Sequence, residues 1–206
     1  AAASTGHCHP KVVQAISDQA HRFVHAQASV YQHDLLEPMA ARLDGLTPES
    51  IDTFFFSSSS DEILEAAVKL AKHATGRQNI ITFDGAFHGR TLLTLAMSTS
   101  RAIDREGYGP FPSGVYVAPF PDPHASDQEE EISRALRGLD RLFATQVPAN
   151  EVAAIIIEPV IGERGYIPTP AAFIQGLDQR CRDNGILFLA DETQSGFGRT
   201  GKMFAV

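Results

Sequence analysis

A buried strand that ends in a carboxylate is the feature that most constrains this chain. Residues 186–190 are five consecutive apolar residues (ILFLA), and Asp191 follows them directly. An uninterrupted apolar run of this length predicts a strand covered on both faces, as in a parallel sheet between helices. A carboxylate at the end of such a strand is costly unless it is paired, so Asp191 needs a metal, an arginine, a helix N-terminus or a protonated ring nitrogen. The alternative is that Asp191 only caps the next turn.

Strand and helix patterns alternate along the rest of the chain, which indicates an α/β fold with a largely parallel sheet. We expect the strands at residues 51–56, 79–83, 115–118, 153–157 and 186–190. We expect the helices after Pro10 and at residues 35–43, 61–73, 127–143 and 171–184, with residues 92–97 either helical or extended.

A run of four serines at residues 57–60 lies between a predicted strand and a predicted helix. A strand, a small polar loop and a helix form an arrangement that binds phosphate, because free backbone N–H groups and the helix dipole point at the anion. The alternative is an ordinary serine cap, with Asp61 and Glu62 in the first turn of the helix.

Other unusual groups also follow predicted strands. Phe87 and His88 lie between two glycines after the strand at 79–83, where Phe87 is able to stack on a flat ligand, and Glu158 follows the strand at 153–157. Ligands of such sheets bind at the carboxyl ends of the strands. An anion site, an aromatic platform and an acid for a ring nitrogen are what pyridoxal 5′-phosphate requires. A core phenylalanine beside a hydrogen-bonded histidine is the alternative for Phe87 and His88.

Composition excludes several other classes of protein. The formal charge of −8 argues against a nucleic-acid surface, and no apolar run approaches the length of a membrane span. Two cysteines, Cys8 and Cys181, do not make a disulfide framework, so we expect a cytoplasmic protein. His7, Cys8 and His9 are too close together in sequence to converge easily on one ion, so we expect a turn into a helix and no metal site.

The motifs together resemble class III pyridoxal-phosphate aminotransferases of fold type I, such as 4-aminobutyrate, acetylornithine and ornithine aminotransferases. The resemblance covers essentially the whole chain, and its last motif is the most specific. The matching stretches are GHCHP at residues 6–10, EILEAAVK at 62–69, FHGRT at 87–91, IEPV at 157–160 and DETQSGFGRTG at 191–201.

The resemblance implies a role for each matching residue. Asp191 pairs with the pyridine nitrogen, Gln194 bonds the ring hydroxyl, and Thr193 packs on one ring face. Phe87 stacks on the other face with His88 beside it, and the phosphate lies on the backbone around Ser59, Ser60 and Asp61. On the substrate side, Glu158 lies near the cofactor, and Glu163 matches a gate glutamate of members that use ω-amino acids. The implied reaction moves an amino group from an ω-amino acid to a 2-oxo acid, in a homodimer without nucleic-acid or membrane partners.

The chain departs from the family pattern at three places. It has Ser58-Ser59-Ser60 where the family has Asn-Ser-Gly, and the loss of that glycine is expected to tighten the phosphate loop. Asp61 would repel a phosphate unless it points away. Arg164 stands where the family favours glycine, and we expect it to be able to pair with the adjacent Glu163.

The lysine that forms the Schiff base with the cofactor has no match here. The family has it downstream of the motif at 191–201, and the only lysines are Lys11, Lys69, Lys72 and Lys202. We therefore expect residues 1–50 to lead into a large cofactor domain at 51–206 that is incomplete and inactive by itself.

Two other functions stay open. The G-x-G-x-x-G pattern at residues 196–201 formally matches a nicotinamide-binding loop, but that motif should directly follow a strand and open a helix. A non-catalytic member of the fold, with a decayed phosphate loop, is the second alternative.

Overall fold

The fold is built on a parallel sheet of four strands. The computed structural model describes residues 3–206, and its strands lie in the order β2-β1-β3-β6, with every neighbouring pair parallel. Their bounds are Val115–Ala118 (β2), Asn79–Phe83 (β1), Val152–Ile157 (β3) and Leu187–Ala190 (β6). A short antiparallel pair, β4 (Val160–Ile161) and β5 (Ile167–Pro168), follows β3. The parallel sheet expected from the sequence is confirmed.

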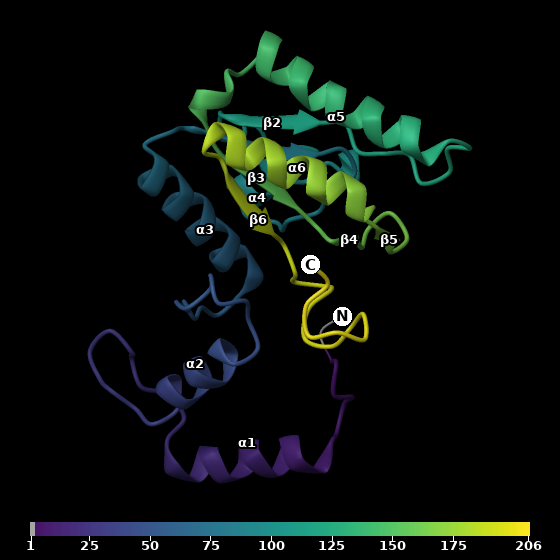
Figure 1. The fold of residues 1–206 in the computed structure, drawn as a ribbon. Coiled ribbons are helices and arrows are strands. Elements are labelled where there is room, and N and C mark those ends of the chain that lie inside the picture. The colour runs from purple at the N-terminus through teal and green to yellow at the C-terminus, as the bar shows by residue number, and fades with distance from the viewer. Residues whose placement is uncertain (1–2) are drawn as a thin grey trace.

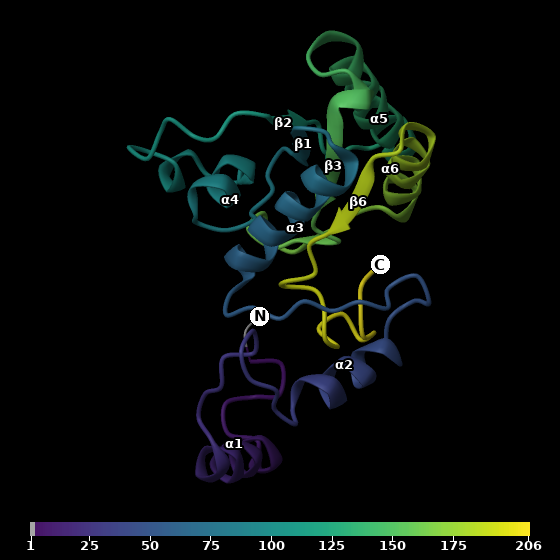
Figure 2. The same cartoon turned by 90° about the vertical axis from the view of Figure 1, so that its left-hand side faces the viewer.

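Helices cover both faces of this sheet, so the fold has three layers (Figure 2). On one face α3 (Ser60–Thr75) and α4 (Leu92–Met97) pack on Ile80 and Ile156. On the other face α5 (Gln128–Thr145) and α6 (Ala171–Asn184) pack on Ile81 and Ile155. Successive strand residues point to opposite faces, so the apolar runs of β1 and β3 supply both layers of the core. Two short 3-10 helices are η1 (Ala102–Asp104) and η2 (Ala149–Glu151).

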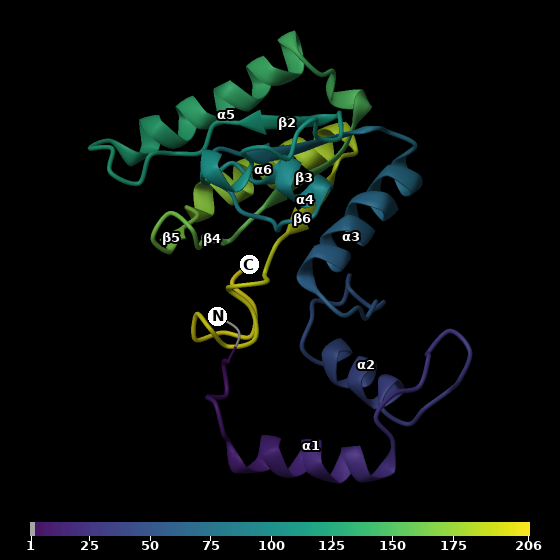
Figure 3. The same cartoon turned by 180° about the vertical axis from the view of Figure 1, so that it is seen from behind.

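The N-terminal segment forms an arm that lies apart from the sheet (Figures 1 and 3). It carries α1 (Pro10–Arg22) and α2 (Leu36–Asp44), and no residue from 3 to 63 is buried. Pro10 is in the first turn of α1, so the expected turn into a helix is confirmed. The C-terminal residues reach back toward this arm, where the Arg199 side chain donates to the hydroxyl of Ser4 over 3.2 Å.

Two strand predictions need correction. Residues 51–56 form no strand, and Phe55 is 69% exposed, because this segment has no neighbouring strand to pair with and β-propensity alone does not make a sheet. The last strand is not buried on both faces as expected. Leu187 is 40% exposed because β6 is the edge strand of the sheet, with no strand on its outer side within residues 3–206.

The order of the strands creates the place for a ligand. The chain runs from β1 to β2 on one side and then crosses to β3 on the other side of β1. The connections that leave β1 and β3 therefore diverge, and a crevice opens between them at the carboxyl ends of the strands. The motif at residues 87–91 follows β1 and Glu158 follows β3, so both lie at this switch point.

Phe173 is expected to be a major contributor to stability. It is fully buried under the sheet, with its ring edge-on to Phe83 and Phe120 at centroid distances of 5.5 and 5.8 Å. Phe173→Ala should lower the free energy of unfolding by about 3–5 kcal/mol, because a cavity replaces the ring. Leu70→Ala, on the exposed side of α3, should change it by less than about 0.5 kcal/mol. Urea unfolding curves of the two variants provide the comparison.

Candidate functional site

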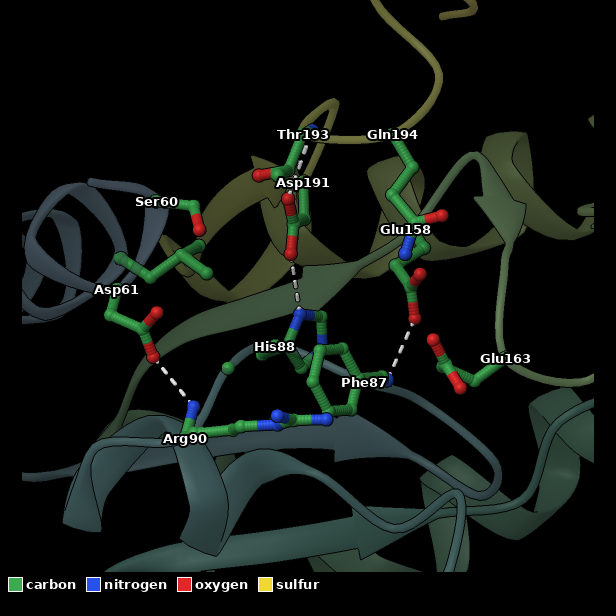
Figure 4. A pocket seen from close by; sticks show the side chains of 12 residues that line it. Ser60, Asp61, Phe87, His88, Arg90, Glu158, Glu163, Asp191, Thr193 and Gln194 are labelled. Atoms are coloured by element: carbon green, nitrogen blue, oxygen red, sulfur yellow. Dashed lines mark hydrogen bonds and ion pairs between the residues drawn. The ribbon is translucent and has the colours of Figure 1, made fainter. Parts of the chain in front are cut away.

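The ends of β1, β3 and β6 and the first turn of α3 enclose one cavity of about 280 Å³ (Figure 4). Every site residue predicted from the sequence lines it except Ser59, which is next to Ser60 in the chain. The cavity is lined by Ser60, Asp61, Leu64, Phe87, His88, Gly89, Arg90, Glu158, Glu163, Asp191, Thr193 and Gln194. These residues converge on one cavity although they come from four separate segments of the chain, 60–64, 87–90, 158–163 and 191–194.

A buried hydrogen-bonded pair, His88 and Asp191, lines the cavity. His88 Nδ1 lies 2.7 Å from Asp191 Oδ2, and the two side chains are 0% and 4% exposed. Because an ionised carboxylate can only accept, Nδ1 carries the proton of this hydrogen bond. Burial by itself raises the pKa of Asp191, but the hydrogen bond and the charge of His88, with the N–H of Thr193, bring this pKa below its usual value. Asp191 is therefore held as an anion.

Two hydrogen-bond acceptors that the sequence did not suggest hold the 85–89 loop. The backbone N–H of His88 donates to Ser98 Oγ over 2.9 Å, and Thr99 Oγ1 accepts from the N–H groups of Gly85 and Ala86 over 2.7 and 3.1 Å. Ser98 and Thr99 come after α4, about ten residues downstream, and no local pattern marks them. His88 Nε2 is buried without a hydrogen-bond partner among residues 3–206, as expected of a ring that faces a site rather than the core.

Glu158 joins the loops that follow β1 and β3. Its carboxylate accepts from the N–H of Phe87 over 2.8 Å and from the N–H of Gly162 over 3.3 Å. Burial raises the pKa of Glu158, while these two N–H donors and the charge of His88 act in the opposite direction. The pKa values of the two carboxyl groups in this cavity are therefore shifted in opposite directions. That of Asp191 is lowered, because it has a histidine partner, and that of Glu158 is raised, because its hydrogen-bond donors are only backbone N–H groups.

The serine loop caps the first turn of α3. Ser59 Oγ accepts from the N–H of Glu62 over 3.3 Å, and the Glu62 carboxylate returns to Ser57 Oγ and the N–H of Ser58 at 2.6 and 3.0 Å. The expected serine cap is therefore present. The N–H groups of Ser60 and Asp61 have no acceptor on another residue among those described, although the Asp61 N–H also lies beside its own carboxylate. The start of α3 can therefore receive an anion, with the Ser60 N–H as the donor that has no acceptor.

The loss of glycine does not strain this loop. Ser60 stands where the family has that glycine. It is the first residue of α3, and among the described non-glycine residues only Tyr166 and Phe197 have a positive φ. Serine adopts right-handed helical backbone, so the expectation of a tightened loop is wrong in its physical premise.

Asp61 points toward the α4 end of the site. Its Oδ1 accepts from the N–H groups of Arg90 and Thr91 at 2.6 and 3.2 Å and from Thr94 Oγ1 at 2.9 Å. Gly89, with a φ of +135°, allows this approach, because a Cβ there would lie 2.1 Å from the same oxygen. These three donors stabilise the Asp61 carboxylate, which thereby joins the first turn of α3 to the motif at 87–91.

The other lining residues come from three loops. Figure 4 shows Thr193 and Gln194 on one side of the cavity and the ring of Phe87 on the other. The Gln194 amide packs against Gly162, and the Arg90 guanidinium lies 6.0 Å from the centre of the Phe87 ring. Arg90 had no role assigned from the sequence, although it belongs to the motif at 87–91. Glu163 lies at the exposed rim.

Two sequence expectations are settled by this geometry. Arg164 does not pair with Glu163; the structure places its Nη1 3.8 Å from Asp84 Oδ2. The pattern at 196–201 lies in consecutive turns with no helix after it among the described residues, which contradicts the nicotinamide-binding interpretation. Within residues 3–206 no three His, Cys, Asp or Glu side chains are grouped to hold a metal, and no helix has the length and apolarity needed to cross a bilayer.

Comparison with known proteins gives consistent matches. A family model described as "Aminotransferase class-III" matches residues 1–206. The chain is 41% identical over 201 residues to a 2-aminoadipate transaminase of Pseudomonas putida, covering 97% of the chain and 48% of that protein. It is 37% identical over 207 residues to a 4-aminobutyrate aminotransferase of Escherichia coli, covering 98% of the chain and 47% of that protein. The chain thus spans about half the length of the curated relatives it matches.

Solved structures give the same result for the fold. A taurine:2-oxoglutarate aminotransferase from Bifidobacterium kashiwanohense, solved with PLP and glutamate, matches with a TM-score of 0.89 and 28% identity. The match covers 97% of this chain and 46% of that one. An (S)-enantioselective omega-transaminase from Thermomicrobium roseum matches with the same TM-score and identity, over 97% of this chain and 47% of that one. The fold type I architecture expected from the sequence is confirmed.

The Asp191–His88 pair should make stability depend on pH in the acid range. A carboxylate with a lowered pKa stabilises the fold above the ordinary carboxyl pKa of about 4, and this contribution is lost as pH falls through the lowered value. Between about pH 6 and about pH 2, the wild type should lose about 1–3 kcal/mol more unfolding free energy than Asp191→Asn, which has no charge to lose. Urea unfolding over this pH range measures both proteins.

Glu158→Gln is the control, because its effect on the loss of stability in acid should be opposite to that of Asp191→Asn. Because burial raises the pKa of Glu158, its protonation favours the fold as pH falls, and that gain is lost as pH rises through the raised value. The glutamine variant should therefore lose more stability than the wild type on acidification, whereas the asparagine variant should lose less. Equal acid slopes for all three proteins would show that neither carboxyl is perturbed.

Proposed function

We propose a function from one premise: this chain belongs to the class-III aminotransferase family. We infer that the complete protein is a pyridoxal-phosphate transaminase, which moves an amino group from an ω-amino acid to a 2-oxo acid. The observation that carries the proposal is the buried Asp191 carboxylate, which is paired with His88 and opens on the cavity at the switch point. The names of the relatives support the donor class, since they include 4-aminobutyrate, 5-aminovalerate and 2-aminoadipate enzymes.

The residues of the cavity fit this cofactor. A phosphorylated aromatic ring needs an anion site, a stacking face and an acid, and the cavity offers the N-terminus of α3, the Phe87 ring and Asp191. The buried and unpartnered Nε2 of His88 is a further sign that these groups serve a ligand. When bound, pyridoxal phosphate supplies an electron sink for the carbon that carries the amino group.

In this proposal each residue has a defined task. Asp191 holds a proton at the ring nitrogen, and His88 orients Asp191 through the 2.7 Å hydrogen bond. Phe87 and Thr193 pack on the two ring faces, and Gln194 donates to the ring hydroxyl. Ser59, the N-cap of α3, and the first two α3 residues, Ser60 and Asp61, provide the phosphate site, with the backbone N–H groups of the last two as donors.

On the substrate side we propose Glu158 and Glu163. Glu158 is already bonded to two backbone N–H groups, so its part is to hold the Phe87 loop against the substrate. Glu163 is exposed at the rim, where its carboxylate can meet a cationic group. The donor is an ω-amino acid such as 4-aminobutyrate, with acetylornithine and ornithine as the next choices.

We further propose a cytoplasmic homodimer. Free Cys8 and Cys181 agree with a reducing compartment. The arm of residues 3–63 has no buried side chain and exposes Val13, Ile16 and Tyr31, as expected of a segment that packs on another surface. A non-catalytic role has less support, because the serine loop that suggested it is unstrained.

Asp191→Asn should abolish turnover while leaving the fold intact. The amide keeps the hydrogen bond from His88 but cannot hold the ring nitrogen in its charged form, so we expect a loss of about 10²- to 10⁴-fold in kcat. The assay uses the complete protein with pyridoxal phosphate, 4-aminobutyrate or ornithine, and 2-oxoglutarate. Asp127→Asn is the matched control, since Asp127 only caps α5 and asparagine caps equally well. Near-normal turnover by Asp191→Asn would refute the role of Asp191.

The lysine that binds the cofactor is expected to lie outside residues 1–206. Lys11, Lys69 and Lys202 are exposed, Lys72 is half-buried, and none of the four lines the cavity. Borohydride reduction of the complete protein, followed by mass spectrometry, should therefore place the cofactor on a different lysine. A stoichiometric adduct on any of these four would contradict the proposed site.

A further inference from the structure

The turn that follows β6 carries two residues of the cavity lining, Thr193 and Gln194. It begins at Glu192, whose own side chain does not line the cavity. The N–H of Gly196 donates to the carbonyl of Glu192 over 2.9 Å, and the hydroxyl of Ser195 donates to Glu192 Oε2 over 2.6 Å. Thr193 and Gln194 are therefore enclosed between Glu192 and two residues that are bonded to it.

The other oxygen of the Glu192 carboxylate holds the segment that returns after the glycine-rich loop. Glu192 Oε1 accepts from the N–H groups of Ala205 and Val206 over 2.7 and 3.1 Å. Between these anchor points the loop closes on itself, since the N–H of Gly198 donates to the carbonyl of Met203 over 3.3 Å. One carboxylate thus joins a turn at the cavity to a stretch of chain 13 residues further on.

The glycines of this loop are explained by the same geometry. A Cβ on Gly196 would lie 3.0 Å from the carbonyl oxygen of Glu192, which is closer than a side chain normally comes to a backbone oxygen. Gly198 and Gly201 have φ values of +84° and +93°, which favour glycine. The pattern at 196–201 therefore belongs to a closed loop that is tied to Glu192.

Asp191 fixes only the start of this turn. Its N–H donates to the last residue of β3 over 2.8 Å, and its Oδ1 accepts from the N–H of Thr193 over 3.1 Å. No hydrogen bond within residues 3–206 holds the side chain of Gln194, which packs against Gly162. The position of Gln194 therefore depends on the rest of the turn, which Glu192 closes.

We propose that Glu192 is a positioning residue for the cofactor, because it closes the turn that presents Thr193 and Gln194 to the ring without touching the ring itself. The inference rests on the proposed function and extends it to a carboxylate outside the cavity lining. Groups that bind a ligand must be held to within about 0.5 Å, and a loop reaches that precision only when neighbouring hydrogen bonds lock it. The three donors on the Glu192 carboxylate supply that lock.

The test measures the binding of pyridoxamine 5′-phosphate to the complete protein, freed of cofactor, by isothermal titration calorimetry. This ligand has no aldehyde to react with a lysine, so its Kd reports the noncovalent contacts of the ring and the phosphate. Glu192→Ala should raise Kd about tenfold, the loss expected for one hydrogen bond to the ligand, because Gln194 loses its place with the turn. Glu192→Gln should stay within about threefold of the wild type, because its amide oxygen accepts the same N–H groups and its amide nitrogen donates to Ser195.

Two further variants separate positioning from a general structural effect. Glu131→Ala is the matched control, because Glu131 also accepts a backbone N–H, that of Asp122 over 2.8 Å, but lies on α5 outside the cavity lining. Its Kd should equal that of the wild type. The double variant E192A/Q194A should bind little more weakly than Q194A, because both changes remove the same contact with the ring. Fully additive losses would show that Glu192 acts by another route and would overturn the inference.

Hydrogen exchange reports on the turn without any ligand. The amides of Ala205 and Val206 should exchange faster in E192A than in the wild type or E192Q, because only E192A lacks their acceptor. Unchanged exchange in E192A would refute the closure by Glu192. If E192A does not fold, Gly196→Ala disturbs the same turn through its contact with the Glu192 carbonyl, and an unchanged Kd in that variant overturns the inference.

The binding measurement also separates this inference from the proposed function. A complete wild-type protein that binds no pyridoxamine 5′-phosphate would refute the proposed function and the inference with it. Wild-type binding together with an unchanged Kd in folded E192A would refute the inference alone and leave the proposed function intact.

Discussion

A carboxylate buried at the end of a strand is the constraint on which this structure depends. Asp191 is almost fully buried, and its charge would be costly without the hydrogen bond from His88. That bond joins the end of β6 to the loop after β1, across the strand β3 that lies between them in the sheet. The pair therefore fixes the geometry of the cavity and also keeps one anion available inside it, which is the basis of the proposed function.

The rest of the cavity is assembled by carboxylates that accept backbone N–H groups. Glu158 joins the loops after β1 and β3, and Asp61 joins the first turn of α3 to the motif at 87–91. Each loop is thus held by an acceptor from a different segment. Because charge-assisted hydrogen bonds are stronger than neutral ones, a few carboxylates suffice to make irregular loops rigid. The acidic groups around the site therefore hold its loops in place in addition to any part they take in the reaction.

The departures from the family pattern are accommodated by local geometry. The serine loop needs no left-handed residue, and the Asp61 charge is taken up by Arg90, Thr91 and Thr94. The guanidinium of Arg164 is directed to Asp84 instead of its neighbour. Each of these residues looks unfavourable beside a cofactor site in the sequence alone. Ordinary backbone geometry resolves the serine loop, and partners far away along the chain resolve Asp61 and Arg164.

The sequence by itself determined the α/β class, the parallel sheet and the group of residues at the strand ends, because apolar runs and turn residues act locally. It also brought Asp191, Phe87 and His88 together, since carboxyl ends of parallel strands share one edge. Only the tertiary structure decided that residues 51–56 form no strand and that β6 is an edge, because strands need partners. It alone decided which donor each carboxylate meets. Ser98, Thr99 and Asp84 have no local signal for these contacts, because a hydrogen-bond partner is chosen by the fold and not by its distance along the chain.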